Sequence, residues 1–177
     1  MGHAKHEVSK QQRRKPWIRY ERTHCLSLVH TDYHYTSDGR YLCTILDDAS
    51  RKVLAAGDFD HKTTENALFV LKQAIKECVS WNHPVLAVLT DYGSEFYANE
   101  CDAKGHADHE YEQFLKDQGI RQILCGVNHP QTNGELEWYD LYINHRDRCG
   151  SLEAMVLWYN EEKPHGSLNL DIAGTPS

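Results

Sequence analysis

Short apolar segments separated by turn-forming residues make up the first third of the chain. Leu, Val, Ile, Tyr and Thr are frequent in residues 25–35, 40–46 and 52–59, as is usual for β-strands. The residues between them, 37–39 and 47–50, include Ser, Asp and Gly, which favour turns. The pattern therefore predicts three consecutive strands that pair as an antiparallel meander.

The spacing of apolar residues changes in the middle third of the chain. From about Thr63 to Trp81 they recur every three or four positions, which predicts an amphipathic helix. Residues 85–89 are a continuous apolar run, typical of a strand buried on both faces. A second helix is predicted over 107–118 and a fifth strand over 120–124.

The last third of the chain is predicted to be helical after one loop. Residues 126–134 are dense in Gly, Asn, Pro and Thr, which indicates a loop. One helix is predicted from Asn133, a favourable N-cap, and another over 151–160. The buried stripe expected on the first of these helices consists of Leu136, Tyr139 and Ile143. The order of elements predicts a mixed α/β fold with a five-stranded sheet.

Charge is distributed unevenly along the 177 residues. The net charge of −7 argues against a protein that coats nucleic acid. Residues 1–22 nevertheless contain seven Lys and Arg against two Glu. Such an arm either contacts a phosphate backbone or is a solvated terminus, and both interpretations stay open. We therefore expect a basic lead at 1–22, partly disordered or a linker, and one folded catalytic core at 23–177.

The apolar segments and the cysteine pattern indicate the expected cellular location. No long apolar stretch or signal-peptide pattern occurs, so we expect a cytoplasmic protein without a membrane span. The six cysteines are dispersed and form no CxxC pair, which indicates reduced thiols. Those expected to fill strand and helix interiors are Cys25, Cys43, Cys78 and Cys125.

Three acidic residues occupy positions at which a metal site can form. Asp32 lies inside the first predicted strand, Asp91 follows the fourth, and Glu137 is near the start of a helix. Carboxylates on strands beside apolar runs are unfavourable unless they are paired or metal-bound. Mg²⁺ prefers oxygen ligands, and two such ions can clamp the oxygens of a phosphoryl displacement. With 26 Asp and Glu in the chain, spacing alone does not single out this triplet.

Five segments carry a resemblance to a known family. In chain order they are VHTDYHYT, ILDDASR, LTDYGSEF, NHPQTNGELE and YNEEKPHGSLNLDIAGTP, and they cover most of residues 16–177. They resemble the integrase core domain of prokaryotic insertion-sequence transposases, which is similar to the catalytic cores of retroviral integrases. The resemblance implies a ribonuclease H-like fold, in which three antiparallel strands precede helix, strand, helix and strand, with helices on both faces of the sheet.

The same resemblance implies a site, cofactors and partners. It assigns Asp32, Asp91 and Glu137 as catalytic residues that bind two Mg²⁺ or Mn²⁺ ions. The residues that it assigns to DNA contact are His129, Gln131 and Asn133. Expected partners are DNA, as transposon ends and target, and further copies of the chain in a homodimer or larger homo-oligomer.

Other acidic residues compete for the metal-binding roles. The family pattern places the glutamate three residues after Gly134, which selects Glu137 over Glu135. Asp48 matches a motif position that binds no metal in the family, and we interpret it as a turn former. Glu95 follows the second aspartate closely, but we expect it to be exposed to solvent.

The chain departs from the family pattern in two places. The spacing between the second aspartate and the glutamate exceeds the family's usual one, and the surplus at 97–109 is expected to be an exposed loop. Cys101, His106 and His109 within it lack a fourth zinc ligand. Trp138 replaces a cation that usually follows the glutamate, and we expect it to pack in the core rather than stack on a base.

The predicted function is that of a metal-dependent DNA transposase or integrase core, active in DNA integration and recombination. Metal-activated water would hydrolyse a phosphodiester at the transposon end, and the freed 3′-hydroxyl would attack target DNA. Two alternatives stay open: a degenerate, non-catalytic DNA-binding or oligomerisation module, and a ribonuclease H-like nuclease. Because no helix-turn-helix segment is recognisable ahead of the core, we expect an isolated or shortened core.

Overall fold

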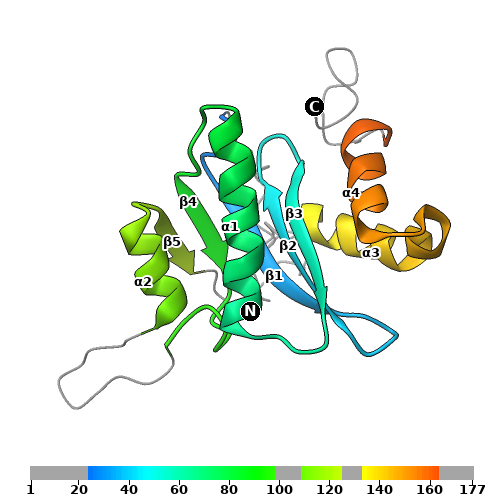
Figure 1. Ribbon diagram of the computed structural model, residues 1–177, viewed down its shortest axis with the longest axis horizontal. Helices are drawn as coiled ribbons and strands as arrows, with labels where there is room; N and C mark the ends of the chain where they lie inside the picture. Colours follow the sequence, from blue (N-terminus) through cyan, green and yellow to red (C-terminus); the bar gives the residue numbers. More distant parts are fainter. Residues whose placement is uncertain (1–23, 99–108, 125–132, 164–177) are drawn as a thin grey trace, which may run out of the picture.

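The computed structural model describes residues 24–98, 109–124 and 133–163 (Figure 1). The strands are β1 (Val29–Tyr35), β2 (Tyr41–Asp47), β3 (Val53–Phe59), β4 (Ala87–Thr90) and β5 (Arg121–Leu124). The helices are α1 (Thr64–Ser80), α2 (Glu110–Asp117), α3 (Asn133–Cys149) and α4 (Leu152–Glu161). None of these helices is long and apolar enough to cross a membrane. The basic lead, most of 97–109 and the loop before α3 lie outside the described residues.

The five strands form one mixed sheet in the order β3-β2-β1-β4-β5. β1, β2 and β3 pair antiparallel, whereas β4 is parallel to β1 and β5 is parallel to β4. This confirms the architecture predicted from the sequence. The helix predicted from about residue 107 begins at Glu110, because His109 caps it and accepts a hydrogen bond at Nδ1 from the N–H of Tyr111 at 3.2 Å.

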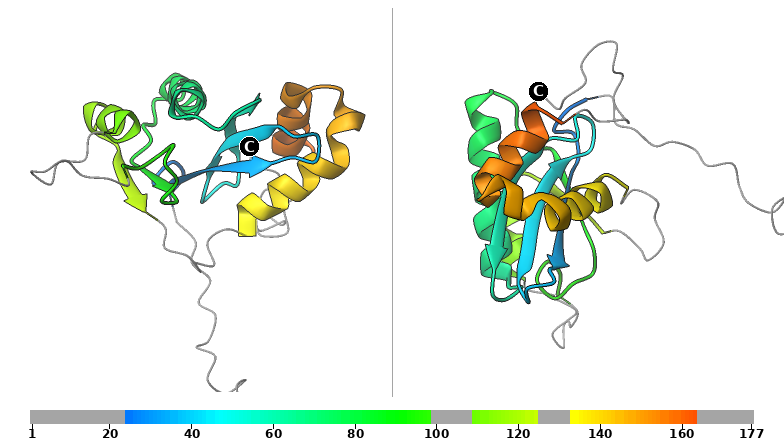
Figure 2. Two further views of the ribbon diagram at one scale, coloured as in Figure 1. Left: turned by 90° about the horizontal axis from the view of Figure 1, so that it is seen from below. Right: turned by 90° about the vertical axis from the view of Figure 1, so that its right-hand side faces the viewer.

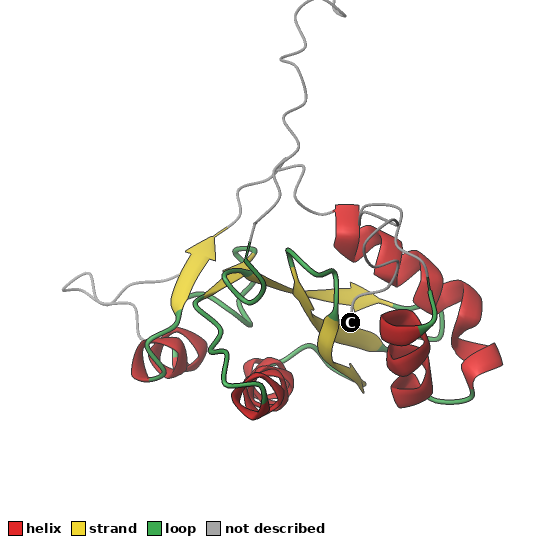
Figure 3. Ribbon diagram, turned by 90° about the horizontal axis from the view of Figure 1, so that it is seen from above, coloured by secondary structure: helices red, strands yellow, loops and turns green. Residues whose placement is uncertain are grey.

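Helices cover both faces of this sheet, also as predicted (Figures 2 and 3). α1 and α2 pack on one face, where Cys43 and Ile45 of β2 belong to the apolar core. α3 and α4 pack on the other face, where Leu42 and Leu46 of β2 belong to a second core. The alternation of side chains along a strand explains why β2 contributes to both.

α1 has the cap and the apolar stripe that the sequence predicted. Thr63 Oγ1 accepts a hydrogen bond from the N–H of Asn66 at 3.2 Å and so begins the helix. The buried residues of the stripe are Ala67, Leu68, Val70, Leu71, Ala74 and Cys78. Burying a Leu or Val side chain contributes roughly 1.5–3 kcal/mol, so this stripe holds the crossover from β3 to β4 firmly on the sheet.

The cysteines divide between the interior and the surface. Cys43 and Cys78 are buried as expected, and burial raises the pKa of the Cys43 thiol to about 12, which makes it unreactive. The expectation for Cys25 was wrong, because it is exposed just ahead of β1 rather than inside a strand. Cys125 lies outside the described residues. All the cysteines in the described ranges are free thiols.

The buried face of α3 differs from the predicted stripe. Tyr139 is buried as expected, but Ile143 is 49% exposed. Trp138 and Tyr142 are buried in its place, so the core role predicted for Trp138 is confirmed. The side chain of Leu136 lies outside the described residues.

Hydrogen bonds explain how Trp138 and Tyr142, which both carry polar atoms, can occupy the buried face. Trp138 Nε1 donates to Thr44 Oγ1 at 3.0 Å, and its ring meets Tyr159 of α4 edge-on at a centroid distance of 4.8 Å. Tyr142 donates its hydroxyl hydrogen to Asp58 Oδ2 at 3.3 Å. Aromatic side chains bury a large apolar area when their polar ends find partners in this way.

Asn160 joins α4 to the edge strand β3. Its Oδ1 accepts a hydrogen bond from the N–H of Val53 at 2.9 Å, and its Nδ2 donates to the carbonyl of Val53 at 2.8 Å. Because the site is buried, Asn160→Ala leaves both backbone groups without partners and is expected to lower the free energy of unfolding by about 2–3 kcal/mol.

Urea denaturation measures this difference. The exposed Gln73→Ala on α1 serves as the control and should stay within about 0.5 kcal/mol of the wild type. Equal midpoints for the two variants would show that the Val53 bonds contribute nothing net.

Candidate active site

β1 and β4 are adjacent parallel strands whose register brings two aspartates together. His30 of β1 is paired with Leu89 of β4. Continuing this register by two residues places Asp32 beside Asp91, which directly follows β4. Neighbouring strands lie about 4.8 Å apart, so the backbones of the two aspartates are close neighbours at the C-terminal end of β4.

The segment after β4 folds back on Asp91. Asp91 Oδ1 accepts a hydrogen bond from the N–H of Gly93 at 2.8 Å. A Cβ atom at Gly93 would lie 2.8 Å from both Asp91 Oδ1 and Glu95 Oε1, which is closer than real Cβ contacts. The absence of a side chain at Gly93 therefore allows the turn that brings these two carboxylates together.

Glu95 is 5% exposed, so the expectation that it faces solvent was wrong. Its Oε1 accepts a hydrogen bond from Lys62 Nζ at 3.2 Å, and this bond is the main cause of a raised pKa at Lys62. A buried carboxylate without a partner is strongly unfavourable, which explains the pairing. Sequence reasoning missed Lys62, whose only signal was its place directly before the Thr-rich start of α1.

The electrostatics of Asp32 show that the acidic groups interact. Burial, the largest cause, together with the negative charges of Asp91 and Glu95, raises the pKa of Asp32 to about 6. The N–H of Tyr33, which donates to Asp32 Oδ1 at 2.7 Å, and the charge of Lys62 both act in the opposite direction. Asp32, Asp91, Glu95 and Lys62 thus form one electrostatic cluster, called here the acid cluster.

The first half of α3 lies against the strand that carries Asp32. Tyr139 donates its hydroxyl hydrogen to the carbonyl of Asp32 at 3.1 Å, and its ring stacks on His34 at a centroid distance of 4.5 Å. Glu137 precedes Tyr139 by two residues in the same helix, so its backbone is held near β1. The side chains of Glu137 and Glu135 lie outside the described residues.

The residues expected to contact DNA fall at the margin of the described ranges. His129 and Gln131 lie outside them. Asn133 is the first residue of α3, and its side chain is not among those described. Their assignment therefore stays a prediction.

Asp48 lies away from the acid cluster, at the turn between β2 and β3. Its Oδ1 is 3.0 Å from His30 Nε2 and 3.4 Å from Arg51 Nη1. The preceding Asp47 accepts a hydrogen bond at Oδ2 from the N–H of Ser50 at 2.8 Å. Both aspartates are buried and shape this turn, consistent with the turn-former interpretation.

His109 uses both ring nitrogens in structural contacts. Nδ1 caps α2, and Nε2 lies 2.9 Å from the carbonyl of Ser94, so the ring links α2 to the turn that carries Glu95. This arrangement leaves no ring nitrogen for a zinc ion. The other two residues considered for zinc, Cys101 and His106, lie outside the described residues.

The donor chemistry of the acid cluster suits a hard divalent cation. Asp32 of β1 and Asp91, directly after β4, offer carboxylate oxygens, and burial with like charge disfavours the ionised form of Asp32 in the absence of a cation. Across the described ranges, no three His, Cys, Asp or Glu side chains are arranged as a complete metal site. The side chains of the two glutamates near the start of α3 are not among those described.

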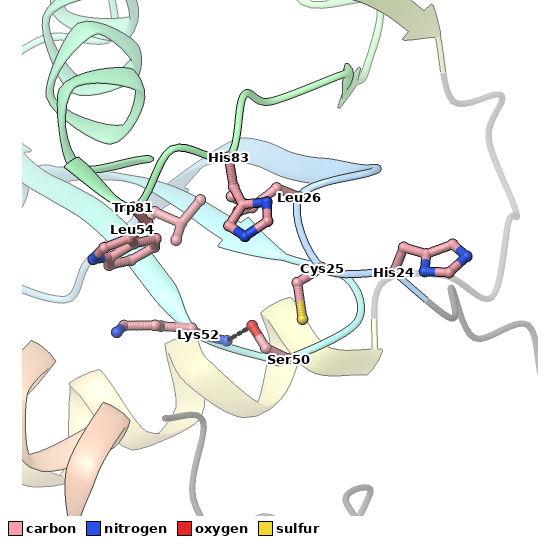
Figure 4. A pocket seen from close by; sticks show the side chains of 8 residues that line it. All are labelled: His24, Cys25, Leu26, Ser50, Lys52, Leu54, Trp81 and His83. Carbon is pink, nitrogen blue, oxygen red and sulfur yellow. Dashed lines mark hydrogen bonds between the residues drawn. The ribbon is translucent and has the colours of Figure 1, made fainter. Parts of the chain in front are cut away.

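A pocket of about 690 Å³ lies beside the segment that precedes β1 (Figure 4). Its lining consists of His24, Cys25, Leu26, Ser50, Lys52, Leu54, Trp81 and His83. Lys52 Nζ lies 4.5 Å from the centroid of the Trp81 ring. Since no Asp or Glu belongs to this lining, the pocket is distinct from the acid cluster and does not resemble a carboxylate metal site.

Residues 22–130 match the family profile of the integrase core domain, which is more than half of the chain. The chain belongs to the integrase core domain family. The matched region includes the acid cluster and ends before α3. The match therefore spans the whole sheet with α1 and α2, while Glu137 lies beyond it.

A viral protein is similar in sequence to this integrase core. It is the ORF3 product of Spiroplasma virus SpV1-C74, whose name assigns it as an integrase, and it is 27% identical over 143 residues. The alignment covers 73% of this chain and 39% of the viral protein. The chain thus spans less than half the length of this relative.

Two solved structures share the fold of this integrase core. The catalytic core domain of BIV integrase superposes with a TM-score of 0.59 at 18% identity, covering 85% of this chain and 90% of that one. The catalytic core domain of HTLV-2 integrase in complex with magnesium, in a trimeric form, gives a TM-score of 0.57 at 16% identity, covering 84% and 92%. The ribonuclease H-like architecture implied by the sequence is thereby confirmed.

Proposed function

We propose that this chain is the catalytic core of a transposase or integrase that hydrolyses a phosphodiester at transposon ends and joins the freed end to target DNA. The observation that supports this most is the register between β1 and β4, which, continued by two residues, sets Asp32 of β1 beside Asp91 directly after β4. Membership of the integrase core domain family supports the same reaction class.

Two Mg²⁺ or Mn²⁺ ions would be held by Asp32, Asp91 and Glu137. When bound, such ions activate water or a hydroxyl group and stabilise the charge that develops at the scissile phosphate. The carboxylates act as ligands and not as nucleophiles. Burial of Asp32 and its acidic neighbours makes its ionised form unfavourable until positive charge arrives, so the site is prepared for cations.

DNA and a second copy of the chain are the proposed partners. Joining two transposon ends needs two active sites held together, which a homodimer or larger homo-oligomer supplies. His129, Gln131 and Asn133 are proposed to contact the DNA, because amide and imidazole groups bond phosphates and base edges.

Glu137→Gln tests the third ligand. Loss of one carboxylate is expected to slow Mg²⁺-dependent cleavage and joining by at least about 100-fold, since fewer ligands then hold the ions that stabilise the transition state. The assay follows a labelled duplex that carries the element's terminal sequence.

The matched control is Glu135→Gln, two residues earlier in α3, which should stay within about threefold of the wild type. A larger loss from Glu135→Gln than from Glu137→Gln would transfer the ligand role to Glu135.

Two further measurements separate the remaining alternatives. A degenerate core has no need to bind metal, so calorimetric titration with Mn²⁺ should show no binding to a dead scaffold and clear binding to an active one. A ribonuclease H-like nuclease would cleave the RNA strand of an RNA–DNA hybrid, whereas the proposed enzyme should act on duplex DNA and leave the hybrid intact.

A further inference from the structure

Lys62 is the positively charged member of the acid cluster, and its backbone is fixed between β3 and α1. The carbonyl of the next residue, Thr63, accepts a hydrogen bond from the Tyr33 hydroxyl at 2.8 Å. The carbonyl of the preceding residue, His61, accepts one from Asn66 Nδ2 at 2.9 Å. Both neighbours of Lys62 are therefore anchored, one of them to the strand that carries Asp32.

The Lys62 side chain lies at the rim of the acid cluster. Its Nζ donates to Glu95 Oε1 at 3.2 Å, yet the lysine side chain is 49% exposed whereas that of Glu95 is 5% exposed. An ammonium group has three hydrogens to donate. The hydrogen bond to Glu95 uses one of them, and the exposed part of the group can meet a molecule that arrives from solvent.

A lysine at this rim has opposite effects on the two ligands proposed for the site, the divalent cations and the DNA phosphate. Its positive charge acts on Asp32 and therefore repels divalent cations at that position. The same charge attracts a phosphate, for which lysine is a good point-charge partner. The ion pair with Glu95 alone is a weak reason for the presence of Lys62, because a half-exposed ion pair contributes little to stability.

We propose that Lys62 binds a non-bridging phosphate oxygen of the DNA strand next to the acid cluster, and so positions that strand. This inference rests on the proposed function, since it takes DNA as the substrate. In this role Glu95 holds the lysine at the rim while the neighbouring aspartates stay available for metal. Lys62 is thus a positioning residue that lies outside the expected metal-ligand set.

The salt dependence of DNA binding tests this contact without catalysis. Binding of a short fluorescein-labelled duplex to the full chain is followed by fluorescence anisotropy at several KCl concentrations, with Ca²⁺ held constant. Loss of one phosphate contact in Lys62→Met should make the plot of log K against log[salt] shallower by about 0.9. Affinity at low salt should fall roughly 3- to 10-fold, and Lys62→Arg should keep the wild-type slope.

The matched control is Lys72→Met on α1, whose ammonium lies 5.2 Å from the centroid of the Phe114 ring, away from the acid cluster. It should leave the slope unchanged. A Lys62→Met slope equal to that of the wild type, in a variant whose circular dichroism shows it to be folded, overturns the inference and leaves Lys62 as a partner of Glu95 only. If the wild type itself binds no DNA, the proposed function fails first and the inference falls with it.

Discussion

Asp32→Asn is expected to abolish cleavage and strand transfer while making the folded chain more stable near pH 8. Under the proposed function, activity should fall at least about 1,000-fold, because the substituted amide is a poor ligand for the proposed metal ions. Stability should rise, because a buried carboxylate beside Asp91 and Glu95 is replaced by a neutral group of the same shape. The site would then be an example of stability sacrificed for function.

The gain in stability from Asp32→Asn should depend on pH. The pKa of Asp32 is about 6 in the folded chain, above its ordinary value, so protonation favours the folded state below about pH 4 and this contribution is lost as the pH rises through about 6. A pKa shift of that size corresponds to at most about 3 kcal/mol in the free energy of unfolding. Solvent screening reduces the expected gain in stability to about 1–2 kcal/mol above pH 7. Below pH 4 the variant and the wild type should coincide.

Urea denaturation at a series of pH values, beside a strand-transfer assay, measures both effects. Asp117→Asn, on the exposed face of α2, is the control and should change neither stability beyond about 0.5 kcal/mol nor activity. Retained activity in Asp32→Asn would remove Asp32 from the metal site. A stability difference that does not vary with pH would instead mean that the pKa of Asp32 is not shifted in the folded chain.

Trp138→Ala is expected to cause the largest loss of stability of any single change considered. The side chain is fully buried between β2 and α4, so its removal leaves a cavity and an unpaired hydroxyl at Thr44. Losses of about 3–5 kcal/mol are typical for a buried Trp. Activity should fall further than the folded fraction explains, because Trp138 directly follows Glu137 and fixes the start of α3 against the sheet.

The partly exposed Trp158 on α4 is the control of the same residue type. Trp158→Ala should cost about 1 kcal/mol and leave the activity per folded molecule unchanged. Chemical denaturation gives the stabilities, and assays at a temperature where each variant is folded give the activities. Equal losses in the two variants would mean that the Thr44 and Tyr159 contacts of Trp138 add nothing to its stabilising role.

The order of elements could be predicted because local patterns determine it. The run at 85–89 is apolar without alternation because it leads into β4, which is buried along its whole length, although Leu86 just before the strand is exposed. The stripe from Ala67 to Cys78 has helical spacing because α1 covers one face of the sheet. Such features depend on neighbours in sequence. They are therefore visible before any tertiary contact is known.

The environment of Glu95 could not be predicted because it depends on contacts distant in sequence. The turn at Gly93 returns the side chain toward the sheet, and its partner, Lys62, lies 33 residues earlier. In α3, Tyr142 was overlooked because its burial depends on an acceptor at Asp58 of another element. Polar partners of this kind have no periodic signal.

Asn160 also limits how copies of this chain can associate. A strand at the edge of a sheet offers its backbone to any strand that approaches, which is a common route to unwanted polymers. At Val53 the Asn160 amide already makes the two bonds that an incoming strand would make. At that end of β3, a second copy would have to dock through side chains rather than by extending the sheet.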